Sequence, residues 1–174
     1  MAGKDACSTR IKTIYQISMQ ETNLKATERN LPHWELDGAT YFITFNTWQK
    51  LELTPEARQI VLNSCLFFNN KRYKILVLVV MADHVHILIE PWLKSENEYW
   101  SNSSIMHSIK SYSSNQISKA IKHKGIIWQD ERYDRIVRDE QELLATWEYI
   151  RQNPVKAGFS NTPEEYPFFW QASE

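Results

Sequence analysis

The sequence predicts an α+β fold, in which helices pack against an antiparallel sheet. Residues 40–48 alternate aromatic and β-branched side chains with threonine, which is typical of a strand. Residues 74–80 and 81–90 are two apolar runs that meet at the short connection Ala82-Asp83, which indicates a hairpin. Apolar residues recur at helical spacing before and after this hairpin. The predicted order of strand, helix, strand, strand, helix and strand is the ferredoxin-like split βαβ pattern, to which the sequence adds one more helix.

The part of the chain before the hairpin divides into an arm, a turn, the first strand and a helix. Residues 1–30 are polar without a sustained period, and we interpret them as an N-terminal arm. Residues 31–39 are turn-like and lead into the strand at 40–48. The segment Thr54-Pro55-Glu56 combines an N-cap, a proline at the first helical position and an acid, so it predicts a helix that continues to about Phe68.

A loop and a second helix are predicted after the hairpin. Residues 92–102 are expected to form a polar loop, and Ser103 or Ser104 could cap a helix that runs to about His123. The inner stripe of this helix would consist of Ile105, Ile109, Tyr112, Gln116, Ile117 and Ala120.

The last predicted strand and the extra helix follow. Residues 126–128 and 133–137 could supply the strand, with a turn between them. Asp139 begins the extra helix with Glu142 as its capping-box partner, and Asn153-Pro154 is expected to end it. Its inner face would be Leu143, Leu144, Trp147 and Ile150. We therefore divide the chain into the arm at 1–30, a domain at 31–159, and an aromatic tail at 160–174 that packs back on the core.

Composition and charge exclude several classes of protein. The 174 residues suffice for one well-buried domain, and 43% hydrophobic with 24% charged residues is ordinary for a globular protein. The first ten residues lack the apolar core of a signal peptide, and no apolar run reaches the length of a membrane span. Cys7 and Cys65 form neither a disulfide framework nor a zinc knuckle. We expect a cytoplasmic protein without a membrane partner. Its net charge of −1 disfavours bulk coating of nucleic acid but permits a localised basic face.

Two pairs of polar residues point to a metal site. His84 and His86 alternate with apolar residues on a strand, so both project from one face, about 6.6 Å apart at Cα. Tyr149 and Asn153 stand four residues apart on the extra helix, about 6 Å along its axis. A helix laid across the histidines could place a phenol and an amide oxygen beside two imidazoles. Such mixed ligands leave positions for phosphate oxygens and suit Mg²⁺ or Mn²⁺, with the phenol as a candidate nucleophile.

Four motifs along the chain carry a family resemblance. They are ADHVHILIE, IMHSIKSY, IWQDERYDRIVRDEQEL and WEYIRQNPVKAGF, in this order. Over about Leu31 to Phe159 the chain resembles the single-tyrosine transposases of the His-hydrophobic-His superfamily, and within them it is most similar to the REP-associated tyrosine transposases.

The resemblance implies a divalent-metal-dependent nuclease and strand transferase acting on single-stranded DNA near hairpins. It implies His84 and His86 as metal ligands and Asn153, one turn after the tyrosine, as the third ligand. It also implies that Tyr149, on the extra helix, attacks a phosphodiester to leave a 5′-phosphotyrosine link and a free 3′-hydroxyl. Whether such a protein works as a monomer or a homodimer stays open.

Other interpretations of these residues remain open. Tyr149 could be a packing residue, and Tyr133 is a competing tyrosine in a basic stretch. The whole chain could be a nucleic-acid-binding module without chemistry, or a metal-dependent phosphodiesterase that uses water. A phosphate-binding side, or merely a solvated face, could be formed by Lys110, Lys119, Lys122, Lys124, Arg132, Arg135 and Arg138.

Overall fold

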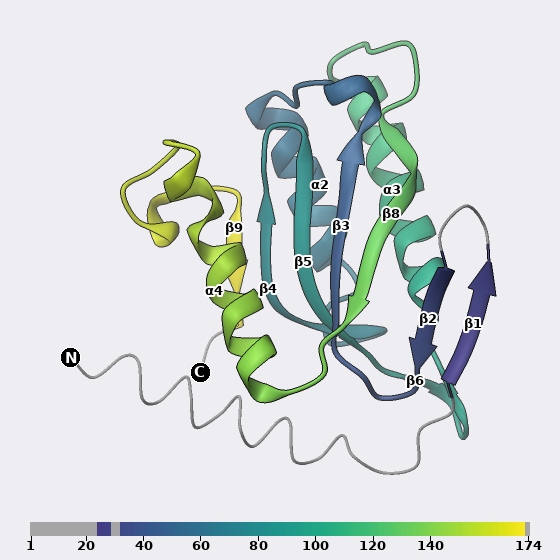
Figure 1. The fold of residues 1–174 in the computed structure, drawn as a ribbon. Helices are drawn as coiled ribbons and strands as arrows, with labels where there is room; N and C mark the ends of the chain where they lie inside the picture. Colours follow the sequence, from purple (N-terminus) through teal and green to yellow (C-terminus); the bar gives the residue numbers. More distant parts are fainter. Residues whose placement is uncertain (1–23, 29–31, 173–174) are drawn as a thin grey trace.

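A five-stranded antiparallel sheet in the order β8-β3-β5-β4-β9 forms the centre of the molecule (Figure 1). The computed structural model describes residues 24–28 and 32–172. Within them the strands are β1 Leu24–Glu28, β2 Pro32–Leu36, β3 Tyr41–Thr47, β4 Tyr73–Val80, β5 His84–Pro91, β6 Leu93–Ser95, β7 Glu98–Tyr99, β8 Trp128–Ile136 and β9 Phe169–Gln171. The helices are α2 Pro55–Leu66, α3 Asn102–Ala120 and α4 Glu140–Lys156, with short 3-10 turns η1 Trp48–Lys50 and η2 Pro163–Glu165.

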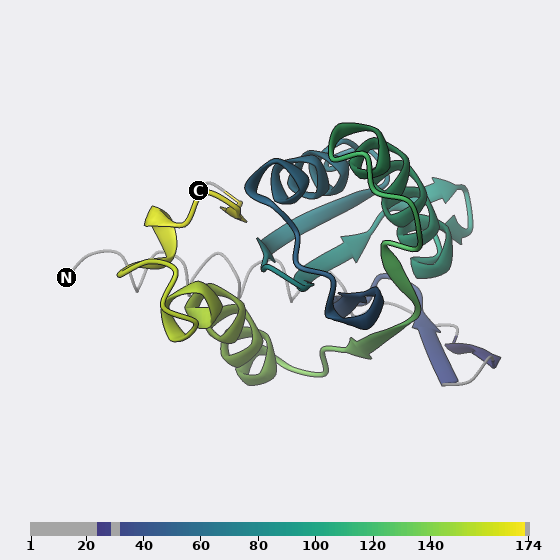
Figure 2. The same ribbon diagram turned by 90° about the horizontal axis from the view of Figure 1, so that it is seen from above.

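The connections between these elements confirm the predicted fold class. Helix α2 links β3 to β4, and α3 links β5 to β8, so the four strands β8, β3, β5 and β4 have ferredoxin-like order, with β9 added beside β4. Helices α2 and α3 cover one face of the sheet, and α4 covers the other (Figure 2). Because both faces are covered, β4 is apolar along almost its whole length instead of alternating, and β5 is buried without interruption from Val85 to Ile89. The strongest apolar runs of the sequence therefore lie at the centre of the sheet.

Helix α2 and the β4–β5 hairpin form as predicted. Thr54 is the N-cap of α2, and its hydroxyl accepts the Ala57 N–H at 3.2 Å. The helix ends at Leu66, two residues before the predicted end at Phe68. Residues 81–83 connect β4 to β5, which places the start of β5 at His84.

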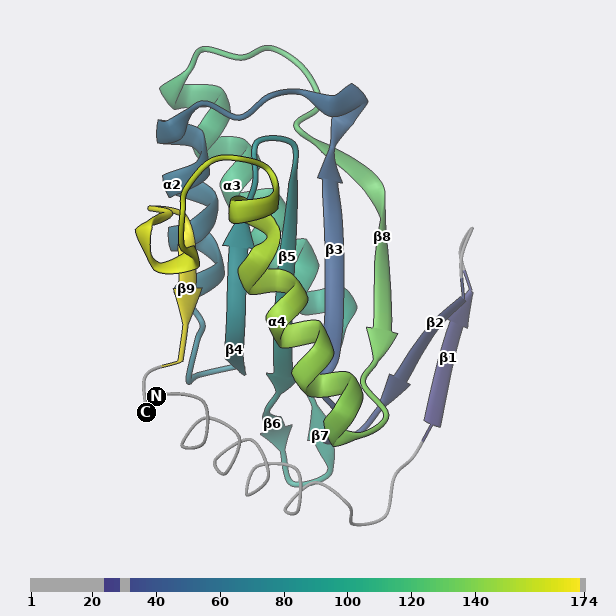
Figure 3. The ribbon, with the colours of Figure 1, turned by 60° about the vertical axis from the view of Figure 1, so that its left-hand side comes forward.

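Two segments predicted as turn or loop contain hairpins. Residues 32–36 form β2, which pairs with β1 over its whole length and lies beside β8 (Figure 3). The predicted arm thus contains a strand at 24–28, while its residues 1–23 and 29–30 lie outside the described part of the chain. Within the predicted loop, β6 pairs with β7. Neither hairpin was predicted, because strands of two to five residues are too short to show a clear alternation of apolar and polar side chains.

The prediction for α3 was wrong at its cap and along part of its inner stripe. Ser101 is the N-cap, and its hydroxyl accepts the Ser104 N–H at 3.2 Å. Tyr112 is 56% exposed, whereas Ser113 is fully buried. The Ser113 hydroxyl can be buried because it donates to the Ile109 carbonyl at 2.7 Å and accepts from the Trp128 indole N–H at 3.0 Å. Ala120 is also exposed.

Strand β8 and helix α4 also differ from the prediction. Residues 128–136 form one continuous strand, and a shift in the β3 pairing replaces the predicted turn. Asp139 caps α4 by accepting the Glu142 N–H at 2.7 Å, as predicted. The helix continues through Pro154 to Lys156, because a proline in the last turn removes only one of the helical hydrogen bonds.

The aromatic tail reaches back to the sheet. Tyr166 and Phe168 are buried, and the Tyr166 hydroxyl donates to the Val80 carbonyl at 2.8 Å. Strand β9 then pairs with β4 as the fifth strand. Among the described residues, no helix is long and apolar enough to cross a membrane.

Candidate active site

The histidine pair lies on the face of the sheet that α4 covers. In the β3–β5 ladder, His86 pairs with Thr44 and His84 with Asn46. The two imidazole centroids are 4.7 Å apart, with their planes at 67°. His86 is buried, and His84 is half-buried at the start of the strand. The alternation along β5 thus brings both rings to one place on this face of the sheet.

Each imidazole is held through its Nδ1 atom by a neighbouring oxygen. The Asp83 carboxylate lies 2.6 Å from His84 Nδ1, and the Thr44 hydroxyl lies 2.8 Å from His86 Nδ1. With Nδ1 engaged, Nε2 is the nitrogen left on each ring for a ligand. A carboxylate that fixes the ring of a ligating histidine is a common second partner in metal sites.

Burial keeps the inner imidazole neutral. Removal from water, and then the neighbouring His84, lowers the pKa of His86 to about 3. A neutral imidazole has a lone pair available for a cation at physiological pH. The inner ring is therefore already in the protonation state that metal binding requires.

Helix α4 adds a phenol to the two imidazoles. The helix packs on β4 and β5 (Figure 3), which brings the Tyr149 hydroxyl to 3.5 Å from His86 Nε2. The phenol ring makes an edge contact with Phe42 at 6.0 Å between centroids, and the Lys156 ammonium lies 5.8 Å from its centre. Tyr149 is nevertheless 44% exposed. The Tyr149 hydroxyl thus lies beside His86 on a side chain that is still open to an incoming molecule.

Asn153 lies one turn beyond Tyr149, and its amide is folded back on the helix. Its Nδ2 donates to the Tyr149 carbonyl at 2.8 Å, which leaves Oδ1 as the atom able to meet a cation. Among the described residues, no group of three or more His, Cys, Asp or Glu side chains is arranged to hold a metal. Two imidazoles and an amide oxygen would leave coordination positions open, unlike the four protein ligands of a closed structural zinc site.

The competing tyrosine, Tyr133, shares this face of the sheet but has a different environment. It pairs with Thr44 across the β3–β8 ladder and is 53% exposed. Its ring contacts Phe42 at 6.3 Å. Tyr149 is the tyrosine whose hydroxyl reaches a histidine.

Three of the predicted DNA-binding residues already have partners within the protein. Arg135 forms an ion pair with Glu142 at 2.8 Å, and Arg132 forms one with Asp134 at 2.9 Å. The Lys110 ammonium donates to backbone carbonyls of β8, the nearest at 2.8 Å. The other predicted basic residues, Lys119, Lys122, Lys124 and Arg138, occupy exposed positions.

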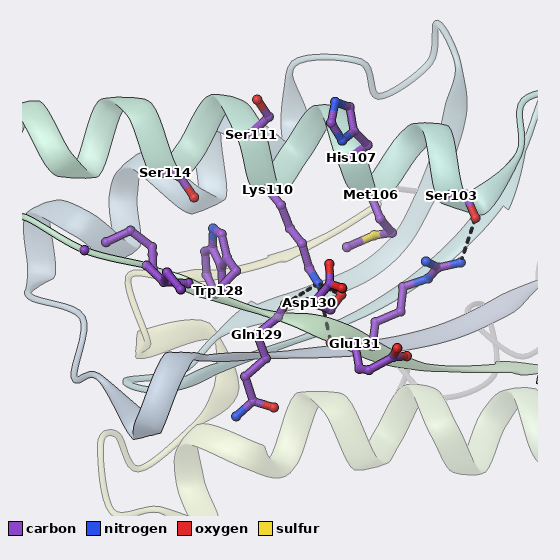
Figure 4. Close-up of a pocket in the computed structure, with 14 residues that line it drawn as sticks. Ser103, Met106, His107, Lys110, Ser111, Ser114, Trp128, Gln129, Asp130 and Glu131 are labelled. Atoms are coloured by element: carbon purple, nitrogen blue, oxygen red, sulfur yellow. Dashed lines mark hydrogen bonds between the residues drawn. The ribbon is translucent and has the colours of Figure 1, made fainter. Parts of the chain in front are cut away.

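A groove of about 650 Å³ lies between α3 and β8 (Figure 4). Lys110 reaches across it to β8, and Arg132 bonds to Ser103 near one end. Burial, and then Arg132, lowers the pKa of Lys110 to about 8. The groove is on the α3 side of the sheet, so the structure does not bring Lys110 or Arg132 together with Tyr149.

Several residues at the site were missed by sequence reasoning. Thr44, Asp83, Phe42 and Lys156 each contact a histidine or Tyr149. Asp83 precedes His84 directly, so its proximity could have been inferred. Thr44 carried no such signal, because its contact depends on the register between β3 and β5.

These features define a class of protein, a ferredoxin-like domain with a histidine pair facing a helical tyrosine. The family described as "Transposase IS200 like" matches residues 47–153, and the chain belongs to this family. A Haemophilus influenzae protein that carries the name REP-associated tyrosine transposase is 24% identical to this chain over 106 residues. That match covers 55% of this chain and 57% of the relative, so the chain spans little more than half of the relative's length.

A solved structure shares the fold. It is a REP-associated tyrosine transposase bound to a REP hairpin, and it superimposes with a TM-score of 0.64 at 22% identity, covering 82% of each chain. At this identity the likeness establishes the fold alone. The predicted resemblance to the REP-associated tyrosine transposases is confirmed by the family match and the named relative together.

Proposed function

We propose that the chain is a DNA nicking and joining enzyme that uses Tyr149 as its nucleophile and a divalent cation held by His84 and His86. The observation that carries this proposal is the 3.5 Å distance between the Tyr149 hydroxyl and His86 Nε2. Membership of a transposase family supplies the substrate class, and the solved relative supplies hairpin-containing DNA as the form of substrate to test.

In the proposed reaction, the Tyr149 oxygen forms a bond to phosphorus and loses its proton. The bond from phosphorus to the 3′ oxygen breaks, and that oxygen takes up a proton to become a free 3′-hydroxyl. The strand stays attached through a 5′-phosphotyrosine link, so a 3′-hydroxyl can later displace Tyr149 and join two strands. A bound Mg²⁺ or Mn²⁺ would supply Lewis-acid stabilisation of the phosphate charge.

The residues around Tyr149 have defined tasks in this reaction. Phe42 packs against the phenol ring and limits its rotation. Asp83 and Thr44 hold the two imidazoles through Nδ1. The Lys156 ammonium, which α4 places near the Tyr149 ring, can balance the negative charge of the phosphate. Asn153 is the third ligand in this proposal.

Covalent capture tests the proposal. The full chain is incubated with single strands from repeats that flank its coding region, with Mg²⁺ or Mn²⁺, and run under denaturing conditions. We expect an adduct that disappears in Tyr149→Phe, because one oxygen is removed while the ring still packs. Tyr133→Phe is the matched control and should keep the adduct. Cutting without an adduct would identify a hydrolase that uses water, and binding without cutting would identify a binding module.

A further inference from the structure

Helix α4 covers only part of the sheet face that carries the histidine pair. The helix packs on β4 and β5, and the end of β3 and the first half of β8 lie beside it (Figure 3). On this uncovered part, Asn46 and Tyr133 are exposed and Thr44 is half-buried. Thr44 pairs with both His86 and Tyr133, and residues that pair across a sheet point to the same face. An open surface of β3 and β8 therefore adjoins the histidines.

The buried ring of Phe42 joins Tyr133 to the candidate nucleophile. Its centroid lies 6.3 Å from that of the Tyr133 ring, 6.0 Å from that of Tyr149 and 5.6 Å from that of His86. The two exposed tyrosines therefore flank one buried aromatic side chain, and their rings can be no further apart than the first two distances together. Nucleotides of a stacked strand are about 3.4 Å apart, so a base on Tyr133 would lie within about three nucleotides of a phosphate at Tyr149.

Tyr133 has the geometry and the chemistry of a stacking surface. Its plane stands at 70° to that of Phe42, an edge contact in which Phe42 can cover at most one face of the tyrosine ring. The side chain carries no charge, so it suits a base better than a phosphate. Every base has an aromatic face, and stacking on an aromatic side chain accepts all four bases. Antiparallel sheets with exposed aromatic residues bind unpaired bases in this way in RNA-recognition domains.

We propose that Tyr133 is a stacking platform for one unpaired base of the bound strand, within about three nucleotides of the phosphate that Tyr149 attacks. The inference rests on the proposed function, because it takes the bound polymer to be DNA and Tyr149 to mark the position of the phosphate. The stacked base holds the strand on the open part of the sheet. Tyr133 thereby contributes to binding and to the choice of cleavage position, and it takes no part in bond breaking.

Equilibrium binding to strands that lack one base tests the platform. Fluorescently labelled single strands from repeats that flank the coding region are titrated with the Tyr149→Phe protein, which cannot cut them in the proposed mechanism. An abasic nucleotide replaces each unpaired nucleotide in turn. At one position we expect the loss of the base to weaken binding roughly 5- to 150-fold. With Tyr133→Leu added, the intact strand should bind equally weakly and the abasic strand no more weakly still, because base and ring act as a pair.

Two further substitutions separate stacking from general effects. Tyr133→Phe keeps the ring, so the missing base should cost the same affinity as it does with Tyr133 intact. Tyr112→Leu makes the same change as Tyr133→Leu at an exposed position of α3, which packs on the opposite face of the sheet, and it should also leave the effect of the missing base unchanged. If every missing base has the same effect in Tyr133→Leu as with Tyr133 intact, the proposal is overturned.

Photochemical crosslinking locates the base without changing Tyr133. 5-Iodouracil is placed at the position where the missing base weakens binding, the complex with Tyr149→Phe is irradiated, and the attached peptide is identified by mass spectrometry. We expect attachment to Tyr133, and attachment to a residue of α3 would overturn the proposal. A wild-type dimer that Tyr133→Leu dissociates, measured by light scattering, would also overturn it, because a second copy would then cover this surface.

Adduct formation by the wild type is scored on the same strands. Coupling between Tyr133 and one base without any adduct would contradict the proposed function alone. An adduct without such coupling would contradict the platform alone, and the absence of binding to any strand would contradict both.

Discussion

At the scale of single residues, the hydrogen bonds of Asn153 separate its possible roles. The sequence predicts that Asn153 ends the helix, since a residue before proline disfavours the α region. In the structure its carbonyl accepts the Ala157 N–H at 3.0 Å, so Asn153 lies inside the last turn. Its side chain bonds back to the Tyr149 carbonyl at 2.8 Å. Its side chain therefore lies along the same side of α4 as the Tyr149 carbonyl, and the C-cap of the helix is Ala157.

Substitutions at Asn153 test whether that oxygen is a ligand. Asn153→Asp keeps an oxygen at the same reach and adds a charge, so Mn²⁺ affinity should be kept or increased. Asn153→Ala should weaken Mn²⁺ binding while lowering stability by only about 1 kcal/mol, the value of one hydrogen bond. Both are measured by Mn²⁺ titration and thermal unfolding. The same Mn²⁺ affinity in Asn153→Ala and wild type would place the third ligand elsewhere.

A pH dependence follows from the burial of His86. Its pKa is about 3 when folded and about 6.5 in the unfolded chain, so the unfolded state takes up a proton first as pH falls. In the metal-free protein, the contribution of neutral His86 to stability should therefore be complete above pH 6.5 and should be lost progressively toward pH 3. One proton limits this loss to about 1.4 kcal/mol per pH unit. The free energy of unfolding is measured by denaturant titration across this pH range, with a chelator to remove metal. The slope due to His86 should be present in the wild type and absent in His86→Leu.

At the scale of elements, α4 is fastened to the sheet edge by Arg135. The guanidinium pairs with Glu142 at 2.8 Å, bonds to the buried Thr146 hydroxyl at 3.2 Å, and lies 5.6 Å from the centre of the Phe42 ring. Phe42 in turn contacts the Tyr149 ring. The position of the phenol therefore depends on how β8 and α4 are joined.

We therefore expect Arg135 to act as a clamp, that is, to hold α4 against β8. An alanine variant distinguishes this structural role from a contact with DNA phosphate. Arg135→Ala should lower the free energy of unfolding by about 1–2 kcal/mol and slow adduct formation, since an ion pair, a hydrogen bond and a cation–π contact are lost. Glu142→Gln should reproduce part of the stability loss. A clamp leaves the salt dependence of DNA binding unchanged. A salt slope reduced by about 0.7 in Arg135→Ala would indicate a phosphate contact instead.

The elements that sequence reasoning recovered are those whose signals are local. The cap at Thr54 and the apolar runs of β4 and β5 depend on neighbours in the chain, and they form as predicted. The buried Ser113 could not be predicted, because its burial depends on an indole of β8 supplied by the tertiary fold. The same holds for the contact between Thr44 and His86. Local pattern placed Tyr149 on a helix, but only packing places its hydroxyl near His86.

At the scale of the whole molecule, the loop that follows α3 lies at the same end of the sheet as the start of β5, the strand that carries the histidine pair (Figure 1). Lys119 in the last turn of α3 and Lys122 and Lys124 in this loop are exposed. Thr47 at the end of β3 and Trp48 at the start of η1 are hydrogen-bonded to the segment before His84 and to the segment after the lysines, respectively. The Thr47 N–H donates to the Asp83 carbonyl and the Trp48 N–H to the Ile127 carbonyl, each at 2.8 Å. A strand whose phosphates meet these lysines could therefore pass over this end of the sheet toward Tyr149.

The salt dependence of DNA binding tests this path. For single strands, each phosphate contact contributes about 0.7 to the slope of log affinity against log salt. Replacing Lys119, Lys122 and Lys124 together by glutamine should therefore reduce the slope by about 2, with thermal stability almost unchanged because all three side chains are exposed. Lys71→Gln, at the other end of the sheet, is the control and should leave the slope unchanged. His84→Ala should abolish cleavage yet retain the wild-type slope, because binding depends on phosphate contacts and cleavage on the site. A triple variant with the wild-type slope would place the path of the DNA on another surface.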